Sequence, residues 1–171
     1  MVCILMWVAQ KGFRDEELFV PKSVFEEKGY IVTVVSHNKG TAWSKFGKII
    51  EVVGFGDIDI GDYDAFLLVG GPGTFNLTDD KILHGYIKRA EKKLSLFGGI
   101  CFAPNIMARA GVLKGKRATV WGGPDIFDKE GVIFEDKNVV NDGKIITANG
   151  PDAALEWAKE IDYYIECNLK K

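Results

Sequence analysis

Four short apolar runs in the first hundred residues constrain the fold of this chain more than any other feature. They cover residues 2–8, 31–35, 65–69 and 94–100. Apolar runs of this length, bounded by turn residues, are typical of fully buried strands. Helix-forming segments lie between several of them. The pattern therefore predicts parallel β-α-β units, in which one mostly parallel sheet is covered by helices on both faces.

The helices of this architecture can be placed from their spacing and end signals. We expect them over residues 16–28, 79–93 and 104–110, with a last helix after Pro151. Helical spacing gives the last helix one apolar face, made of Leu155, Ala158, Ile161 and Ile165.

The remaining strands are shorter. Residues 48–53 and 118–120 indicate two of them, and the tripeptide Asn-Asp-Gly at 141–143 predicts a hairpin between residues 139–140 and 145–146. No repeat or linker interrupts the chain, so we expect one domain over residues 1–171.

The composition is that of an ordinary globular protein and excludes several classes of partner. The formal net charge is −2, which gives no electrostatic case for nucleic acid or for an anionic membrane surface. The apolar run at residues 2–8 is too short to span a bilayer and lacks the basic segment of a signal peptide.

The cysteine and histidine content points to a reducing compartment and to no metal. Three cysteines do not make a disulfide framework, so we expect a cytoplasmic location. The sequence has no C-x-x-C motif, and its only histidines, His37 and His84, have no cysteine near them in sequence. We expect neither a metal nor a cofactor.

Cys101 is the strongest candidate for chemistry. An apolar strand runs directly into it, and Phe102-Ala103-Pro104 opens the next helix. This is the context of a nucleophile elbow, a tight turn that exposes a nucleophile above the sheet. A helix N-terminus beside the sulfur would lower the pKa of the thiol. The alternative is a buried structural cysteine, which is what we expect of Cys3 and Cys167.

Two further features lie near the same predicted sheet edge. The turn Gly70-Gly71-Pro72-Gly73 follows the third strand, and its glycines let backbone N–H groups approach a ligand or an oxyanion. A tight turn without a ligand is the ordinary explanation of this motif. Glu17 follows two other acids at a helix start, where a solvated helix N-terminus is the ordinary explanation. In parallel sheets, ligands bind outside the carboxyl ends of the strands.

Five segments taken together resemble one family. They are residues 17–21 (ELFVP), 62–73 (ending in GGPG), 99–104 (GICFAP), 113–119 (LKGKRAT) and 142–151 (DGKIITANGP). In this order they resemble the ThiJ/PfpI superfamily over essentially the whole chain. That superfamily includes the parkinsonism-associated protein deglycase and archaeal intracellular proteases.

The resemblance implies a flavodoxin-like three-layer α/β sandwich with Cys101 on a strained elbow. It implies that Glu17 hydrogen-bonds the sulfur and that the backbone N–H groups of Gly71 and Phe102 hold an oxyanion. The pocket would be completed by Gly70, Pro72 and Trp121. It also implies a small-molecule carbonyl or acyl substrate and a homo-oligomer.

The sequence departs from the family at both usual histidine positions. Proteolytic members carry histidine directly after the cysteine, where this chain has Phe102, and deglycase or glyoxalase members carry it where this chain has Trp121. We expect Trp121 to form a pocket wall with no histidine nearby. We also expect Glu17 and Cys101 to share a proton, with a protonated Glu17 donating to the thiolate.

Three functional classes follow from these residues. The first is cysteine-dependent chemistry of the glyoxalase, deglycase or hydrolase kind, carried by Cys101 and Glu17 without histidine; an intracellular cysteine protease is its least supported form. The second is a non-catalytic redox, stress-sensing or chaperone-like protein whose Cys101 becomes oxidised. The third is a binding module that holds a metabolite without converting it.

Overall fold

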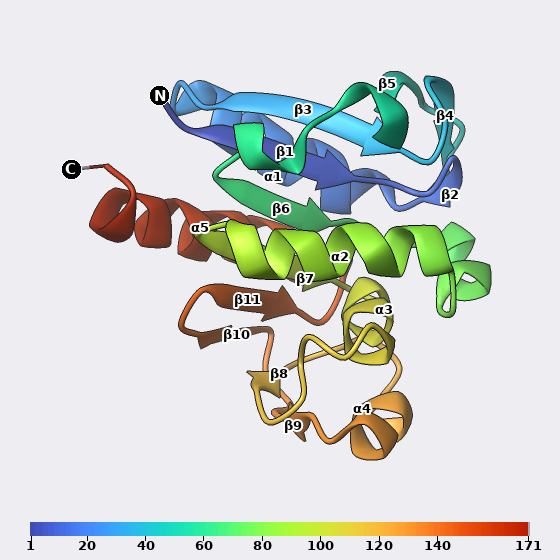
Figure 1. The fold of residues 1–171 in the computed structure, drawn as a ribbon, viewed down its shortest axis with the longest axis vertical. Coiled ribbons are helices and arrows are strands. Elements are labelled where there is room, and N and C mark those ends of the chain that lie inside the picture. The colour runs from blue at the N-terminus through green and yellow to red at the C-terminus, as the bar shows by residue number, and fades with distance from the viewer. Residues whose placement is uncertain (171) are drawn as a thin grey trace.

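The computed structural model describes residues 1–170, and Figure 1 shows how its elements are arranged. The strands are β1 (Cys3–Trp7), β2 (Lys11–Phe13), β3 (Ile31–Ser36), β4 (Gly40–Ser44), β5 (Ile49–Gly54), β6 (Ala65–Leu68), β7 (Leu96–Ile100), β8 (Arg117–Ala118), β9 (Ile133–Phe134), β10 (Val139–Asp142) and β11 (Ile145–Ala148). The α-helices are α1 (Asp15–Glu27), α2 (Lys81–Lys93), α3 (Ala103–Arg109), α4 (Asp125–Glu130) and α5 (Ala154–Asn168). No helix within residues 1–170 is long and apolar enough to cross a membrane.

The main sheet has the strand order β10-β11-β7-β6-β1-β3-β5-β4-β2. Its centre, from β11 through β7, β6 and β1 to β3, is parallel throughout. Antiparallel pairs occur where β10 meets β11 and where β4 meets β5. The predicted mostly parallel sheet and the predicted hairpin at Asn141-Asp142-Gly143 are both confirmed.

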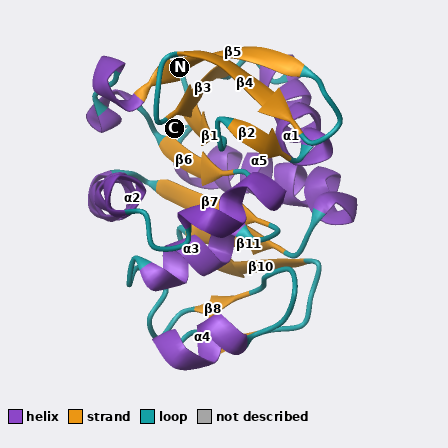
Figure 2. Ribbon diagram, turned by 90° about the vertical axis from the view of Figure 1, so that its right-hand side faces the viewer, coloured by secondary structure: helices purple, strands orange, loops and turns teal. Residues whose placement is uncertain are grey.

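Helices cover both faces of this sheet (Figure 2). Alternate side chains of β1 point to opposite faces, as the two-residue period of a strand requires. Ile4 and Met6 pack in the cluster that contains apolar residues of α1 and α5, whereas Leu5 and Trp7 pack in the cluster that contains those of α2 and α3. The chain is therefore a three-layer α/β sandwich, as the sequence predicted.

The structure differs from the sequence-based expectations at several elements, and α4 and β9 are among those that were not predicted. β2 and β4 were not predicted, because both are short strands near one sheet edge and carry little apolar signal. The expected strand at 118–120 ends at Ala118 and pairs with β9, outside the main sheet. Leu155 is 47% exposed, and the buried face of α5 uses Ala154 and Trp157 instead.

Candidate active site

Cys101 lies between the end of β7 and the start of α3 and has a left-handed backbone, with φ of 62°. It is the only non-glycine residue with positive φ within residues 1–170. This conformation costs about 1–2 kcal/mol for an L-residue, so the surroundings must hold it. The Cys101 N–H donates to the Ala148 carbonyl at 2.9 Å, and its own carbonyl accepts from the Trp121 N–H at 2.9 Å. The predicted strained elbow is confirmed.

A glycine two residues before the cysteine allows the turn. A side chain at Gly99 would begin 2.6 Å from the Met107 sulfur of α3. A larger residue there would require the Met107 side chain to move, so glycine favours close packing of α3 against β7. Pro104 lies in the first turn of α3, where its missing N–H is not needed. The start of α3 therefore packs against the end of β7, and Cys101 lies in the turn between them.

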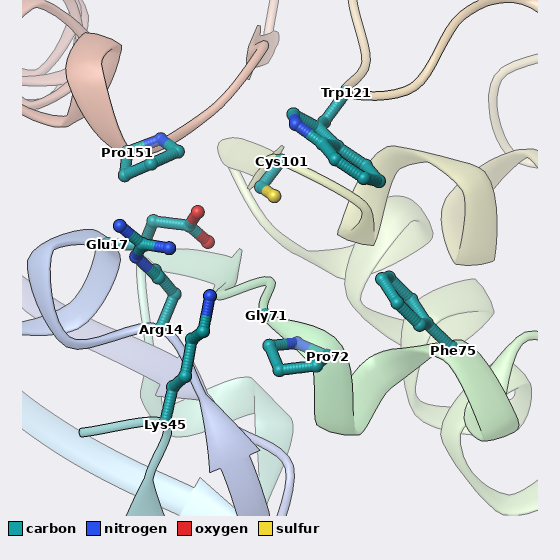
Figure 3. A pocket seen from close by; sticks show the side chains of 9 residues that line it. All are labelled: Arg14, Glu17, Lys45, Gly71, Pro72, Phe75, Cys101, Trp121 and Pro151. Carbon is teal, nitrogen blue, oxygen red and sulfur yellow. The ribbon is translucent and has the colours of Figure 1, made fainter.

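Glu17 reaches the same point from the first turn of α1 and is fully buried. Its Oε2 accepts a hydrogen bond from the Gly70 N–H at 2.9 Å, while Oε1 is buried without a hydrogen-bond partner. Figure 3 shows the carboxyl and the Cys101 thiol on adjoining walls of one pocket. Burial raises the pKa of Glu17 to about 7, although the Cys101 side chain and the Gly70 N–H both act to lower it.

The surroundings of the Cys101 sulfur favour the protonated thiol. The pKa of Cys101 is raised to about 12, chiefly by burial. The Glu17 carboxylate also raises this pKa, and its effect is larger than the opposite effect of the N–H groups of Gly71 and Phe102. This direction is opposite to the lowered thiol pKa expected from the sequence. Two buried acids this close titrate jointly, so the pair retains at least one proton at neutral pH. The expected hydrogen bond from a protonated Glu17 to a thiolate stays a prediction.

The glycine turn after β6 holds the two groups in place. A side chain at Gly70 would begin 2.7 Å from the Cys101 Cβ and 2.8 Å from Glu17 Oε2. Gly71 has φ of 112°, and a side chain there would begin 2.5 Å from the Arg14 backbone nitrogen. The Arg14 N–H donates to the Gly70 carbonyl at 3.1 Å. Glycine is thus required so that α1, the turn and the elbow can meet.

These groups form the floor of a pocket of about 300 Å³. Its walls include Pro72, Phe75 and Trp121, and the Phe75 and Trp121 rings stack with centroids 6.2 Å apart. Trp121 and Pro72 line the pocket as predicted, whereas Gly70, which was also predicted there, does not. The full lining is Arg14, Glu17, Lys45, Gly71, Pro72, Phe75, Cys101, Trp121 and Pro151.

The lining contains no histidine, since both histidines are engaged elsewhere. His37 Nε2 lies 3.0 Å from Asp80 Oδ1, and His84 Nε2 lies 2.8 Å from the Thr78 carbonyl oxygen. Within residues 1–170, no group of three or more His, Cys, Asp or Glu side chains is arranged to hold a metal ion.

The cationic side of the pocket was not predicted from the sequence. Arg14 and Lys45 both line it, together with the aromatic Phe75. Lys45 follows β4, in the region where the apolar pattern is weakest, and no local motif marks it. Of the other two cysteines, which were both expected to be buried, Cys3 is only partly buried and Cys167 is exposed on α5.

Comparison with known proteins finds relatives over most of the chain and a solved structure with the same fold. An uncharacterised protein of Methanocaldococcus jannaschii is 42% identical over 170 residues, covering 96% of this chain and 83% of that protein. The deglycase PfpI of Pyrococcus furiosus is 29% identical over 160 residues, covering 91% and 95%. The crystal structure of a ThiJ/PfpI domain protein from Brachyspira murdochii superposes with a TM-score of 0.91 at 30% identity, covering 96% of each chain.

The flavodoxin-like α/β fold expected from the resemblance is confirmed by this structural match. The profile of the DJ-1/PfpI family matches residues 2–162. Since the match spans nearly the whole sequence and the fold is shared, the chain belongs to the DJ-1/PfpI family.

Proposed function

We propose that this protein carries out cysteine-dependent chemistry on a small carbonyl or acyl compound, of the deglycase, glyoxalase or hydrolase kind. One observation carries the proposal. A buried carboxyl whose pKa is raised to about 7 faces a cysteine on a strained elbow at the floor of a pocket. A general base works best when its pKa lies near the operating pH. Glu17 therefore supplies the function that histidine has in other cysteine enzymes.

The first step follows from the positions of these groups. The ionised Glu17 carboxylate takes the proton of the Cys101 thiol as the sulfur attacks the carbonyl carbon. A C–S bond forms, and the π electrons of the carbonyl move to its oxygen. That oxygen then takes the proton back from Glu17, which gives a hemithioacetal from an aldehyde. The base is regenerated, and no oxidant or reductant is needed.

The backbone around the sulfur supports this step. The N–H groups of Gly71 and Phe102 lie near enough to the sulfur to lower the pKa of Cys101. Neither N–H is taken by a backbone acceptor within residues 1–170. Donors of this kind are fixed before the reaction, so they stabilise developing negative charge without reorganising. We assign them to the oxyanion that forms beside the sulfur.

The redox alternative has one observation in its favour. Glu17 Oε1 has no partner, so a protonated Glu17 could hydrogen-bond an oxygen added to Cys101. Oxidation of this kind follows thiolate character and exposure. Cys101 is only 8% exposed, and its pKa is raised to about 12. Both properties slow oxidation, so we place proton-transfer catalysis ahead of redox sensing.

Turnover assays test the proposal. Purified protein is incubated with methylglyoxal, a small ester and a peptide substrate, beside Cys101→Ser. We expect consumption of the aldehyde or the ester, lost in Cys101→Ser, and no peptide cleavage. Equal rates in the wild type and Cys101→Ser for every substrate would refute the proposal. Rapid formation of a sulfinic acid under mild hydrogen peroxide, without turnover, would favour the redox alternative.

We also propose a homo-oligomer in the cytoplasm. Large apolar side chains are exposed where β4 pairs with β5, since Trp43 is 43% and its partner Ile49 is 65% exposed. A second copy of the chain would cover them. All three cysteines are free, which suits a reducing compartment.

A further inference from the structure

The side of the pocket opposite Trp121 carries two cations whose charge the proposed chemistry does not use. Arg14 and Lys45 both line the pocket, and Figure 3 shows the Lys45 side chain reaching into it. They also share one aromatic ring. The Arg14 guanidinium carbon lies 4.9 Å and Lys45 Nζ lies 5.3 Å from the centroid of Phe46. Two like charges are thus held together at the pocket mouth.

The two cations differ in how far they are neutralised. Arg14 Nε lies 2.7 Å from Glu16 Oε2, so most of its charge is compensated. No carboxylate within residues 1–170 lies within 4.0 Å of Lys45 Nζ. Glu17 is the acid inside the pocket, and at neutral pH it is only partly ionised because its pKa is about 7. The Glu16 carboxylate, whose pKa is lowered by Arg14 and also by Lys45, offsets one of the two positive charges, so the mouth keeps a net positive charge.

The backbone that carries Lys45 is firmly held. The Lys45 N–H donates to the Phe13 carbonyl at 2.7 Å. On either side of it, the buried Asp15 carboxylate accepts from Ser44 Oγ at 2.6 Å and from the Phe46 N–H at 3.2 Å. A buried acid from the start of α1 thus fixes the turn after β4. These hydrogen bonds fix the backbone of Lys45, so its side chain begins at a defined position beside the pocket.

We propose that the substrate of this pocket is a small carbonyl compound that also bears a carboxylate, with Lys45 as the residue that binds the carboxylate. The inference rests on the proposed function for the reacting group. A pocket of about 300 Å³ holds only a small molecule. A single uncompensated ammonium suits a monoanion, whereas a phosphate dianion is usually met by several donors. The carbonyl carbon would lie at Cys101 and the carboxylate at Lys45, with the apolar part against Phe75 and Trp121.

Alkylation of Cys101 by two reagents of nearly equal size tests the charge without requiring turnover. Iodoacetate carries the carboxylate, and iodoacetamide is its neutral counterpart. The rate ratio at Cys101 is measured by peptide mass spectrometry at pH 9, and the exposed Cys167 of the same molecule corrects for reagent reactivity. We expect Lys45→Met to lower the corrected iodoacetate-to-iodoacetamide ratio by about three- to tenfold, the effect of one partly screened charge. Lys45→Arg should keep the ratio.

Lys48 provides the matched control. It lies three residues further along, with Nζ 5.0 Å from the Phe19 ring, and does not line this pocket. We expect Lys48→Met to leave the ratio unchanged. An unchanged ratio in Lys45→Met, or an equal fall in Lys48→Met, overturns the inference whether or not the protein is an enzyme.

An enzyme assay distinguishes failure of this inference from failure of the proposed function. We expect Lys45→Met to raise the inhibition constant of glyoxylate, measured against methylglyoxal turnover, about tenfold relative to that of the neutral aldehyde glycolaldehyde. Equal effects on both inhibition constants would contradict a carboxylate site even if turnover itself is confirmed.

Discussion

Replacing Glu17 with glutamine separates two roles that a carboxyl beside a cysteine can have. Glutamine keeps the volume and can still accept from the Gly70 N–H, which Glu17 Oε2 now does at 2.9 Å. It removes the negative charge that opposes ionisation of Cys101. Above pH 7, where Glu17 is ionised, Glu17→Gln should therefore lower the pKa of the thiol. Below pH 7, Glu17 is mostly protonated and the substitution should change little.

The size of the effect follows from how closely the two groups approach. The Cys101 Cβ and Glu17 Oε2 each lie under 3 Å from the point where a Gly70 side chain would begin. An interaction of about 1.4 kcal/mol at this range raises the thiolate fraction roughly tenfold when it is removed. A less basic thiolate is also a weaker nucleophile, so the reactivity of each thiolate falls about threefold and offsets part of this gain. We expect alkylation about threefold faster at pH 8.5.

The assay is second-order alkylation of Cys101 by iodoacetamide from pH 6 to 9.5, read by peptide mass spectrometry with Cys167 as internal reference. Turnover of the aldehyde should fall by about a hundredfold in the same variant, because the base is lost. Faster alkylation with slower turnover is the signature of a general base. Slower alkylation in Glu17→Gln would show instead that Glu17 donates to a thiolate, as the sequence alone led us to expect, and would refute the electrostatic reasoning.

Three further predictions concern the stability and the assembly of the protein. The pKa of Glu17 is raised from 4.5 to about 7, so the folded state binds a proton that the unfolded state releases. The free energy of unfolding of the wild type, compared with that of Glu17→Gln, should therefore fall by about 3 kcal/mol between pH 4.5 and 7 and then level off. Urea unfolding that shows no such pH dependence would contradict the raised pKa of Glu17. Gly70→Ala should cost about 1–3 kcal/mol and lower Tm by several degrees, whereas Gly85→Ala, with nothing within 4 Å, should not destabilise; equal Tm values in calorimetry would remove the packing argument. Multi-angle light scattering should report a mass of at least two chains, and a monomer at micromolar concentration would count against the proposed oligomer.

Much of this site could be predicted from the sequence because its parts follow buried strands. Cys101 and the glycine turn come directly after β7 and β6, and the carboxyl ends of parallel strands meet at one edge. Pro104, in the first turn of α3, marked the elbow. Glu17 could be assigned only through the family resemblance, since an acid at a helix start has an ordinary explanation of its own.

The rest depends on contacts between distant segments. Lys45 reaches the pocket because β4 folds back beside β2 and a buried Asp15 holds the following turn. Neither β2 nor β4 has an apolar run long enough to be predicted as a strand. The pKa of the thiol was also out of reach, because its direction depends on burial outweighing two N–H groups. A helix start beside a cysteine does not reveal that balance.

The pH dependence of turnover tests the central claim most directly. If the Glu17 carboxylate takes the proton from Cys101, kcat/KM for methylglyoxal should rise with pH through about 7 and then form a plateau, following the ionisation of Glu17. Glu17→Gln should lose this rise together with most of the activity. Activity that stays level from pH 5.5 to 8.5, or the same rise through pH 7 in Glu17→Gln, would contradict the assignment of Glu17 as the base.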